Sequence, residues 1–129
     1  VNRFLTNMPA LKSLRNKVQE AGEQGYIKGL DGRVFQVRSP HSALNTLLQS
    51  AGSIVMKEAL VCFSNLISNL DASVVANVHD EWQVEAFKNH AEEVGDLGVK
   101  AIRESGVRLS LNCPLDGEYK VGLNWSETH

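Results

Sequence analysis

The stretch Val-His-Asp-Glu-Trp-Gln-Val-Glu, residues 78–85, decides the fold of this chain because it lies where two strand-like runs meet. The runs SVVANV and WQVEAF are both rich in β-branched or aromatic side chains, which are common in strands. Only two or three residues separate them, and so short a connection is typical of a tight antiparallel hairpin. The sequence therefore predicts a hairpin over 73–87 with His79 and Asp80 at its tip.

Strict alternation along these strands separates apolar from acidic side chains. One face is expected to carry Val74, Ala76 and Val78 from the first strand, and Trp82, Val84 and Ala86 from the second. The acidic side is expected to carry Glu81, Gln83 and Glu85. One face of the hairpin should then be buried against helices while the other faces water.

Other elements are predicted on both sides of this hairpin. Asn7 and Pro9 resemble a helix start, and glycines after residue 21 end that helix. The segment YIKGLDGRVFQV predicts a second hairpin with a basic turn. Helical periodicity predicts long helices over 40–69 and 89–105, the second ending at Gly106, and a last strand over 114–122. The apolar stripe of the 40–69 helix comprises Leu44, Leu47, Leu48, Ala51, Val55, Ala59, Cys62 and Leu66.

These elements predict an α+β fold. A small antiparallel sheet would combine the 73–87 hairpin with the 114–122 strand, and the two long helices would pack on one of its faces. A length of 129 residues suits a single domain, 1–129. Part of the sheet edge should remain open, and open edges favour association with another copy of the chain.

Composition narrows the class of protein. The chain is 43% hydrophobic and 22% charged, and no apolar run approaches the roughly 20 residues that span a bilayer. The start VNRFLTNMP lacks the features of a secretory signal, so a cytoplasmic location and two free, buried cysteines, Cys62 and Cys113, are expected. A net charge of −2 argues against nucleic-acid binding by bulk positive charge, so phosphate binding must be local.

The hairpin tip is a candidate metal site. A carboxylate on a rigid strand end can hold a divalent cation, and Mg²⁺ commonly uses one or two protein carboxylates together with substrate and water. Asp80 is the best candidate ligand. The alternative is that His79, Asp80 and Glu81 are ordinary turn residues, since Asp is common in turns. Neighbouring strand residues also point to opposite faces, so the three cannot all bind one ion.

A polar stripe on the 40–69 helix is a candidate DNA contact. His41, Asn45 and Gln49 lie four residues apart, on one helix face, and each carries a hydrogen-bond donor. Every correct base pair offers acceptors in the minor groove, so such a row can contact a duplex without reading its sequence. Basic side chains nearby in the sequence, Lys28, Arg33 and Arg38, could contact phosphates. The alternatives are a polar helix face without a task and ordinary solvated charges.

Three blocks of sequence resemble the C-terminal part of the palm of family A DNA polymerases, the bacterial DNA polymerase I group, and in particular its phage replicative branch. The blocks are GYIKGLDGRVFQVRSPHSALNTLLQSAG, VHDEWQVE and PLDGEYKVGLNW. The first resembles the segment that follows the fingers, the second resembles motif C, and the third resembles the closing strand. The resemblance extends from about Phe4 to the end. It implies a helix after the fingers over 1–25, a basic hairpin over 26–38 and a palm core over 39–129.

The resemblance implies roles for individual residues. Asp80 matches the motif C aspartate that binds the catalytic Mg²⁺ ions, two in the complete enzyme. Glu81 matches its acidic neighbour, which assists at the site, and His79 the histidine near the primer terminus. Asn45 and Gln49 match minor-groove contacts, and His41 stands where the phage branch has histidine and the bacterial branch arginine. The implied partners are primer-template DNA and dNTP, in the cytoplasm of a bacterium or of a phage-infected host.

The sequence also departs from the family pattern. A family A polymerase needs a second aspartate in an Asp-Tyr-Ser-like motif A and a fingers helix with Arg, Lys and Tyr, and neither pattern occurs here. The chain is therefore expected to be the final piece of a longer polymerase or one half of a split one. Alone it should bind Mg²⁺ weakly and lack polymerase activity. The whole interpretation requires Asp80 to lie on the same side of the fold as Asn45 and Gln49.

Two other readings remain open. The chain could be a duplex-binding or complementing module of a split polymerase, using His41, Asn45 and Gln49 without chemistry. It could also be a metal-dependent nuclease or hydrolase that uses Asp80, Glu81 and Glu85. Salt-dependent DNA binding without extension would favour the first reading, and cleavage of DNA with Mg²⁺ or Mn²⁺ would favour the second.

Overall fold

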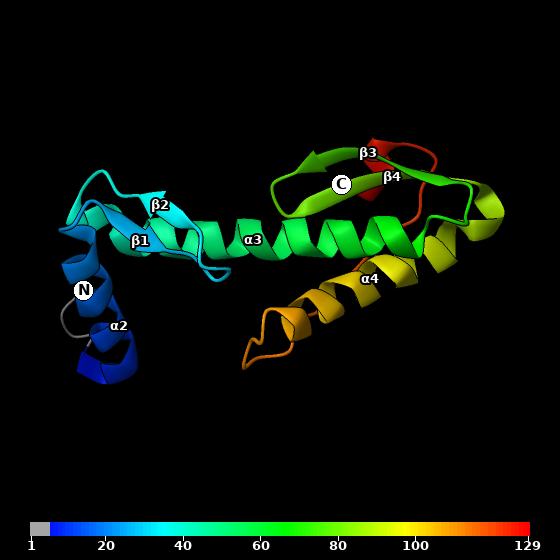
Figure 1. Cartoon of the computed structure of the whole chain (residues 1–129). Coiled ribbons are helices and arrows are strands. Elements are labelled where there is room, and N and C mark those ends of the chain that lie inside the picture. The colour runs from blue at the N-terminus through cyan, green and yellow to red at the C-terminus, as the bar shows by residue number, and fades with distance from the viewer. Residues whose placement is uncertain (1–5) are drawn as a thin grey trace. The chain divides into compact units, whose positions relative to one another are not determined.

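A computed structural model describes residues 6–129 of the chain (Figure 1). Its elements are α2 (Pro9–Gly22), β1 (Tyr26–Lys28), β2 (Val34–Gln36), the 3₁₀ turn η1 (Pro40–Ser42), α3 (Ala43–Leu66), β3 (Ala72–Val78), β4 (Glu81–Ala86), the 3₁₀ turn η2 (Lys88–His90), α4 (Ala91–Arg108) and α5 (Trp125–Thr128). They form two compact units, one up to Ile54 and one from Val55, so α3 contributes to both. The expected mixture of helices and small antiparallel sheets is confirmed.

The first unit is built around the basic hairpin. β1 and β2 pair antiparallel, with Ile27 opposite Phe35, which confirms the hairpin predicted from the sequence. Val18 from α2, Ile27 from β1, and Val37 and Ala43 from the entry to α3 are buried together. This small core holds the start of α3 against the hairpin.

The second unit is built around the β3–β4 hairpin. Its core contains buried side chains from the second half of α3, the turn after it and α4: Cys62, Phe63, Ile67, Val94 and Ala101. The rings of Phe63 and Trp82 stack with their centroids 5.2 Å apart. Ala72, Val74, Trp82, Val84 and Ala86 pack against the same cluster. The two long helices therefore cover one face of this hairpin, as the periodicity predicted.

A β-bulge in β3 changes the face of the residues near the tip. The pairing moves from Val74 to Ala76 without a partner for Val75, and beyond this point Val78 lies opposite Glu81. Residues directly opposite one another share a face of the sheet. The expected placement of Ala76 and Val78 with Val74 is therefore wrong, because one extra residue shifts the alternation by one step.

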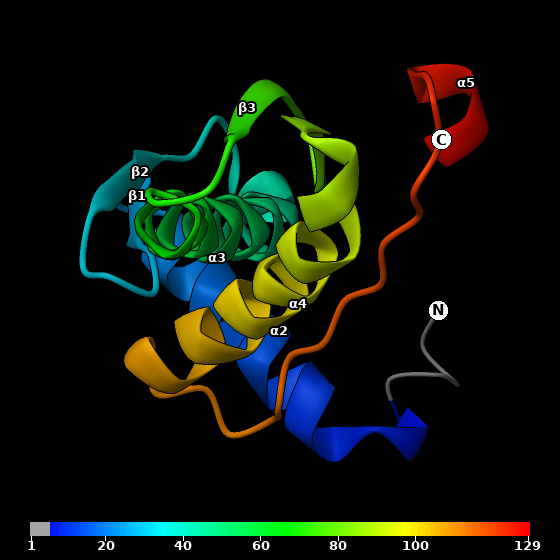
Figure 2. The same ribbon diagram turned by 90° about the vertical axis from the view of Figure 1, so that its right-hand side faces the viewer.

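The strand expected over 114–122 does not form. Within residues 6–129 both sheets have two strands, and 114–122 instead runs extended along α4 (Figure 2). A Cβ at Gly95 would lie 2.3 Å from the Tyr119 ring, so this glycine leaves the space that the ring occupies. The Tyr119 hydroxyl donates to Glu92 Oε2 at 3.0 Å and to Asp96 Oδ1 at 3.2 Å. Side-chain contacts with a helix thus replace the predicted strand pairing.

The end of α4 also differs from the expectation. Gly106 lies inside the helix, where a Cβ would be 3.0 Å from Leu115, so this glycine allows close packing rather than stopping the helix. Ser110, with a φ of 53°, follows the helix end. The N–H of Ser110 donates to the Val107 carbonyl and the N–H of Leu111 to that of Gly106, both at 3.0 Å. These two bonds form a Schellman motif.

The long helix α3 is shorter than the predicted 40–69 range because a 3₁₀ turn precedes it and a separate turn follows it. Ala43, Ile54 and Ala59 face the cores, whereas Leu48, expected in the buried stripe, is 56% exposed. α3 has 24 residues. Across residues 6–129, neither α3 nor any other helix combines the length and apolar character needed to cross a bilayer.

The two cysteines differ in their surroundings. Both are free thiols, but only Cys62 is buried, so the expectation that Cys113 is buried is wrong. Burial raises the pKa of the Cys62 thiol, and its hydrogen bond of 3.0 Å to Glu104 Oε2 adds to the increase. Such a thiol stays protonated and packs as a small apolar side chain.

Candidate active site

The hairpin tip presents its side chains on a two-residue loop. His79 and Asp80 connect the last pair of the ladder, Val78 and Glu81. His79 has a φ of 53°, and hairpin loops of this length favour a positive φ because the resulting twist matches that of the strands. Both loop residues are exposed. The ladder thus holds His79 and Asp80 at a fixed end of the sheet, as the sequence predicted.

The Asp80 carboxylate is free to accept a ligand. Among residues 6–129, none makes a hydrogen bond or an ion pair with its side chain. Binding of a cation by this carboxylate would break no contact within the described part of the protein. Asp80 therefore keeps the property that its predicted role requires.

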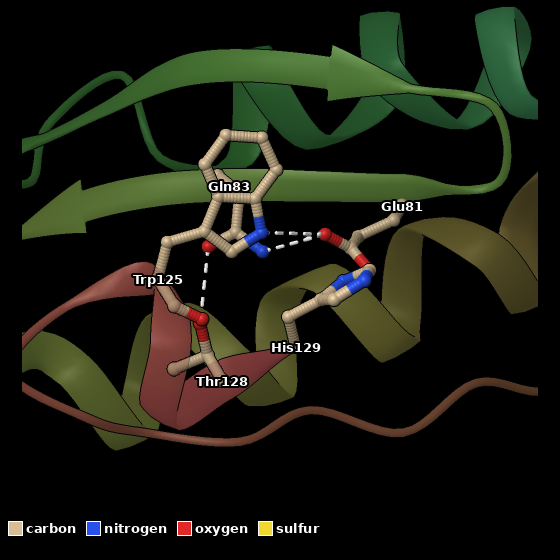
Figure 3. A network of polar contacts seen from close by, with 5 residues as sticks. All are labelled: Glu81, Gln83, Trp125, Thr128 and His129. Carbon is tan, nitrogen blue, oxygen red and sulfur yellow. Dashed lines mark hydrogen bonds and ion pairs between the residues drawn. The ribbon is translucent and has the colours of Figure 1, made fainter.

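Glu81 has very different surroundings, although it is the next residue. Its Oε1 accepts hydrogen bonds from Gln83 Nε2 at 2.7 Å and from Trp125 Nε1 at 3.2 Å (Figure 3). Its Oε2 lies 3.0 Å from His129 Nδ1. Both oxygens are therefore engaged by protein groups, and the side chain is about two-thirds covered, with 33% of it exposed.

These contacts change the acidity of Glu81. The hydrogen bond from Gln83 lowers the pKa of the Glu81 carboxyl most, followed by that from His129. Each donor favours the ionised form because it bonds to the charged oxygen. Glu81 thus remains a carboxylate at a pH lower than usual, and it binds α5 in this form.

The described residues do not form a complete Mg²⁺ site. No group of three or more His, Cys, Asp or Glu side chains within 6–129 is arranged to hold an ion. At the tip, as far as residues 6–129 show, Asp80 has no protein partner at either oxygen, whereas Glu81 accepts two hydrogen bonds at Oε1 and contacts His129 through Oε2. Two-metal sites need carboxylates from more than one segment. The donor set of residues 6–129 therefore fits one ligand of such a site and not the whole of it.

The polar stripe is exposed as predicted. Asn45 and Gln49 lie one turn apart on α3, and both are exposed. His41 is also exposed, but it lies in the 3₁₀ turn η1 rather than in the α-helix expected there. The three side chains belong to the first unit, and their position relative to Asp80 stays a prediction.

The basic residues of the first unit are not equivalent. Lys28 and Arg38 are exposed. Arg33 forms an ion pair with Asp31 within the hairpin turn, where its Nη2 lies 2.6 Å from Asp31 Oδ2. The same contact lowers the pKa of the Asp31 carboxyl. Arg33 therefore offers less free positive charge to a phosphate than its position in the sequence suggested.

The C-terminal residues of the site were not predicted from the sequence. Here α5 contacts β4 through Trp125 and Thr128, and His129, directly after the helix, adds a third contact. A local signal existed: an Asn followed three residues later by Glu is typical of a helix N-terminus. Glu127 lies at the expected position, but it accepts from the Leu123 N–H at 2.8 Å and from Asn124 Nδ2 at 2.9 Å, and the Asn124 side chain does not cap the helix.

Comparison with known proteins finds DNA polymerases of phages and bacteria among the relatives. The chain is 38% identical to the DNA-directed DNA polymerase of Escherichia phage T7, over 98% of this chain and 21% of the relative. It is 34% identical to the DNA-directed DNA polymerase of Escherichia phage Phieco32, over 98% of this chain and 22% of the relative. It is 29% identical to DNA polymerase I of Pseudomonas aeruginosa, over 100% of this chain and 15% of the relative. The chain thus spans about a fifth of the length of the phage relatives.

A solved structure shares the fold. The POL domain of Pol1 from M. smegmatis, in complex with a DNA primer-template and dNTP, matches 79% of this chain with a TM-score of 0.71 and 17% identity, over 21% of its own length. The family described as DNA polymerase family A matches residues 1–127. Because this match covers almost the whole chain, the protein belongs to DNA polymerase family A.

Proposed function

We propose that this chain is the C-terminal palm segment of a DNA-directed DNA polymerase and that Asp80 is one ligand of its catalytic Mg²⁺. The observation that carries the proposal is the free Asp80 carboxylate on the two-residue loop of the hairpin, in a family A chain. Mg²⁺ in such enzymes stabilises the charge of a transferring nucleotidyl group. The remaining ligands, on the motif A strand, and the nucleotide-binding fingers would come from other polymerase segments.

The other predicted residues would contact DNA or support the hairpin tip. His79, beside Asp80, would lie near the primer terminus, and Glu81 would support the tip. The exposed His41, Asn45 and Gln49 suit hydrogen bonds to minor-groove acceptors. Lys28, Arg38 and, less strongly, the paired Arg33 would contact phosphates.

The test of Asp80 uses a polymerase polypeptide that includes this chain. Asp80→Asn removes the charge of the ligand but keeps its shape, and primer extension should fall at least about a hundredfold. Asp71→Asn is the matched control, because Asp71 is an exposed aspartate at the opposite end of the same hairpin. The control should extend primers at the unchanged rate. Equal activity of the two variants would refute the role of Asp80.

The isolated chain should not extend primers, because it offers only one free carboxylate at the tip. Purified chain, primer-template DNA, dNTP and Mg²⁺ provide the assay, with Asp80→Ala as the background. Incorporation well above this background would show that residues 1–129 hold a complete catalytic site, and the proposal would be wrong on this point.

The exposed Asn45 and Gln49 on α3 favour a second candidate function. In this function the chain is a duplex-binding module that complements a separate polymerase segment. This function predicts salt-dependent binding of the isolated chain to primer-template DNA. Replacing both Asn45 and Gln49 with Ala should weaken that binding, whereas replacing Gln19 and Gln24, exposed or partly exposed side chains of the same unit, should not. Extension that starts only when a motif A-bearing segment is added would establish the complementing role.

A further inference from the structure

The short helix α5 contacts the edge of the hairpin at the residue next to Asp80. Trp125 Nε1 donates to Glu81 Oε1, and His129 Nδ1 lies 3.0 Å from the other oxygen. The rings of Trp125 and His129 stand perpendicular, at 88°, with centroids 6.3 Å apart. Figure 3 shows the Trp125 ring from α5 and the His129 ring from directly after α5 approaching the carboxylate. The carboxylate is therefore held at both oxygens.

A second contact joins α5 to Gln83, two residues after Glu81 on β4. Thr128 Oγ1 donates to Gln83 Oε1 at 3.1 Å, and the amide of Gln83 donates back to Glu81. Glu81 and Gln83 share one face of β4, since they are two residues apart in a strand. α5 thus binds two successive side chains of this face, and rotation of Glu81 would break bonds to three residues.

We propose that Trp125 and His129 are positioning residues, which hold Glu81 and through it the strand end that carries Asp80. The proposal rests on the function proposed above and deepens it: Glu81 serves as an anchor for α5, while Asp80 is the ligand. Glu81 Oε1 already accepts two hydrogen bonds, from Gln83 and Trp125, and these occupy both of its lone pairs. The adjacent Asp80 carboxylate accepts no hydrogen bond from residues 6–129, so all of its lone pairs remain available to an ion.

The first experiment tests the contact itself in the chain. In ¹H–¹⁵N NMR spectra, the indole N–H of Trp125, bonded to a carboxylate, should resonate downfield and exchange slowly with solvent. Glu81→Gln should move this signal upfield and speed its exchange, whereas Glu118→Gln, which removes an exposed carboxylate from the extended segment, should leave it unchanged. The indole signal of Trp82 provides an internal reference. An unshifted Trp125 signal in Glu81→Gln would overturn the proposal.

The second experiment tests positioning in a polymerase polypeptide that includes this chain. Trp125→Phe keeps an aromatic ring and removes the indole N–H donor, and it should lower kcat about tenfold with little change in the KM for dNTP. His129→Ala should act similarly, and His129→Gln, which keeps an N–H donor, should restore most of the rate. Because Trp125 is proposed to act through Glu81, Trp125→Phe should add little to the effect of Glu81→Gln.

The outcomes separate this proposal from the proposed function. A polypeptide that extends primers and depends on Asp80, but is insensitive to Trp125→Phe and His129→Ala, would contradict the positioning role alone. Loss of extension in these variants together with a lower unfolding midpoint and additive effects with Glu81→Gln would also contradict it, because the cause would be general destabilisation. If the unaltered polypeptide does not extend primers, the proposed function fails, and the NMR result still decides whether α5 holds Glu81.

Discussion

At the scale of single residues, the conformation of His79 explains how the tip presents its neighbour. A φ of 53° is uncommon for a residue with a side chain, although His adopts it more readily than most. The conformation allows a loop of two residues to close the hairpin, which leaves Asp80 at the very end of the sheet. His79 therefore has a conformational task besides its predicted place near the primer terminus.

Substitutions at His79 should follow this backbone requirement. His79→Gly should leave the free energy of unfolding unchanged or raise it slightly, because glycine adopts a positive φ without strain. His79→Val should lower it by about 1 kcal/mol or more, since a β-branched side chain clashes in this conformation. Urea unfolding measures both changes. Equal stabilities of the two variants would show that the loop tolerates any residue and that φ at position 79 does not constrain the tip.

Tyr119 should lose its proton at an unusually high pH. Its hydrogen bonds to Glu92 and Asp96, together with burial, raise the pKa of its hydroxyl from the ordinary 10.0 to about 12. The folded state favours the neutral phenol, so the stability from this contact is complete below pH 10 and is lost as the pH rises through about 12. Tyr26→Phe leaves Tyr119 as the sole tyrosine, because the chain has two.

The measurement is the phenolate absorbance during alkaline titration. In Tyr26→Phe the folded chain should ionise near pH 12 and the denatured chain near 10.0. In Tyr119→Phe, which leaves only Tyr26, the titration serves as the control for an exposed tyrosine. Ionisation of Tyr119 at the same pH in folded and denatured chains would mean that the extended segment does not lie on α4 in solution.

At the scale of elements, α4 shows how a helix ends without glycine. The Schellman motif places Ser110 in the left-handed region, where most natural helices have glycine. Gly106, the glycine nearest the end, is used inside the helix for contact with Leu115. The two positions therefore have different requirements, conformation at 110 and space at 106.

Ser110→Gly should stabilise the chain by about 1 kcal/mol, because the left-handed backbone costs glycine nothing. The same change in the interior of α3, Ser53→Gly, should instead destabilise it by roughly 0.5 kcal/mol, because glycine loses more conformational freedom in a helix. The pair forms a matched control with opposite expected signs, measured as shifts of the unfolding midpoint in urea. Destabilisation by both substitutions would contradict the Schellman end of α4.

At the scale of the whole molecule, the β3–β4 hairpin has edges without a strand partner among residues 6–129. The segment predicted to add a third strand lies on α4 instead, so the backbone groups of the outer edge remain available. Unpaired strand edges favour association between chains. This is the physical basis for the expectation that the isolated chain associates with itself.

Light scattering at increasing concentration should show a mass that rises above that of the 14.2 kDa chain. Val75→Lys should reduce this rise, because Val75 is an exposed residue of β3 and a charged side chain at a strand edge opposes pairing. Val107→Lys makes the same change on α4, where the side chain is 79% exposed, and should have no effect. A constant monomeric mass at high concentration would count against association through this edge.

Several features were predictable from the sequence because they depend on neighbouring residues. β-propensity and turn chemistry within a few positions identify the two hairpins, and apolar periodicity identifies α3 and α4. The same local reasoning fails for 114–122, since an extended segment can pair with a strand or lie on a helix. The glycine at 95 leaves room for Tyr119, and this choice depends on the surface offered by α4.

By itself, then, the sequence determined the family, the α+β class and the carboxylate that stands at the hairpin tip. Only the tertiary structure decided that Asp80 is free while Glu81 is held by α5. The physical reason is distance along the chain: the bonds from Trp125 and His129 to Glu81 join residues 44 and 48 positions apart. Such contacts form only when the whole second unit packs, and no local pattern specifies them.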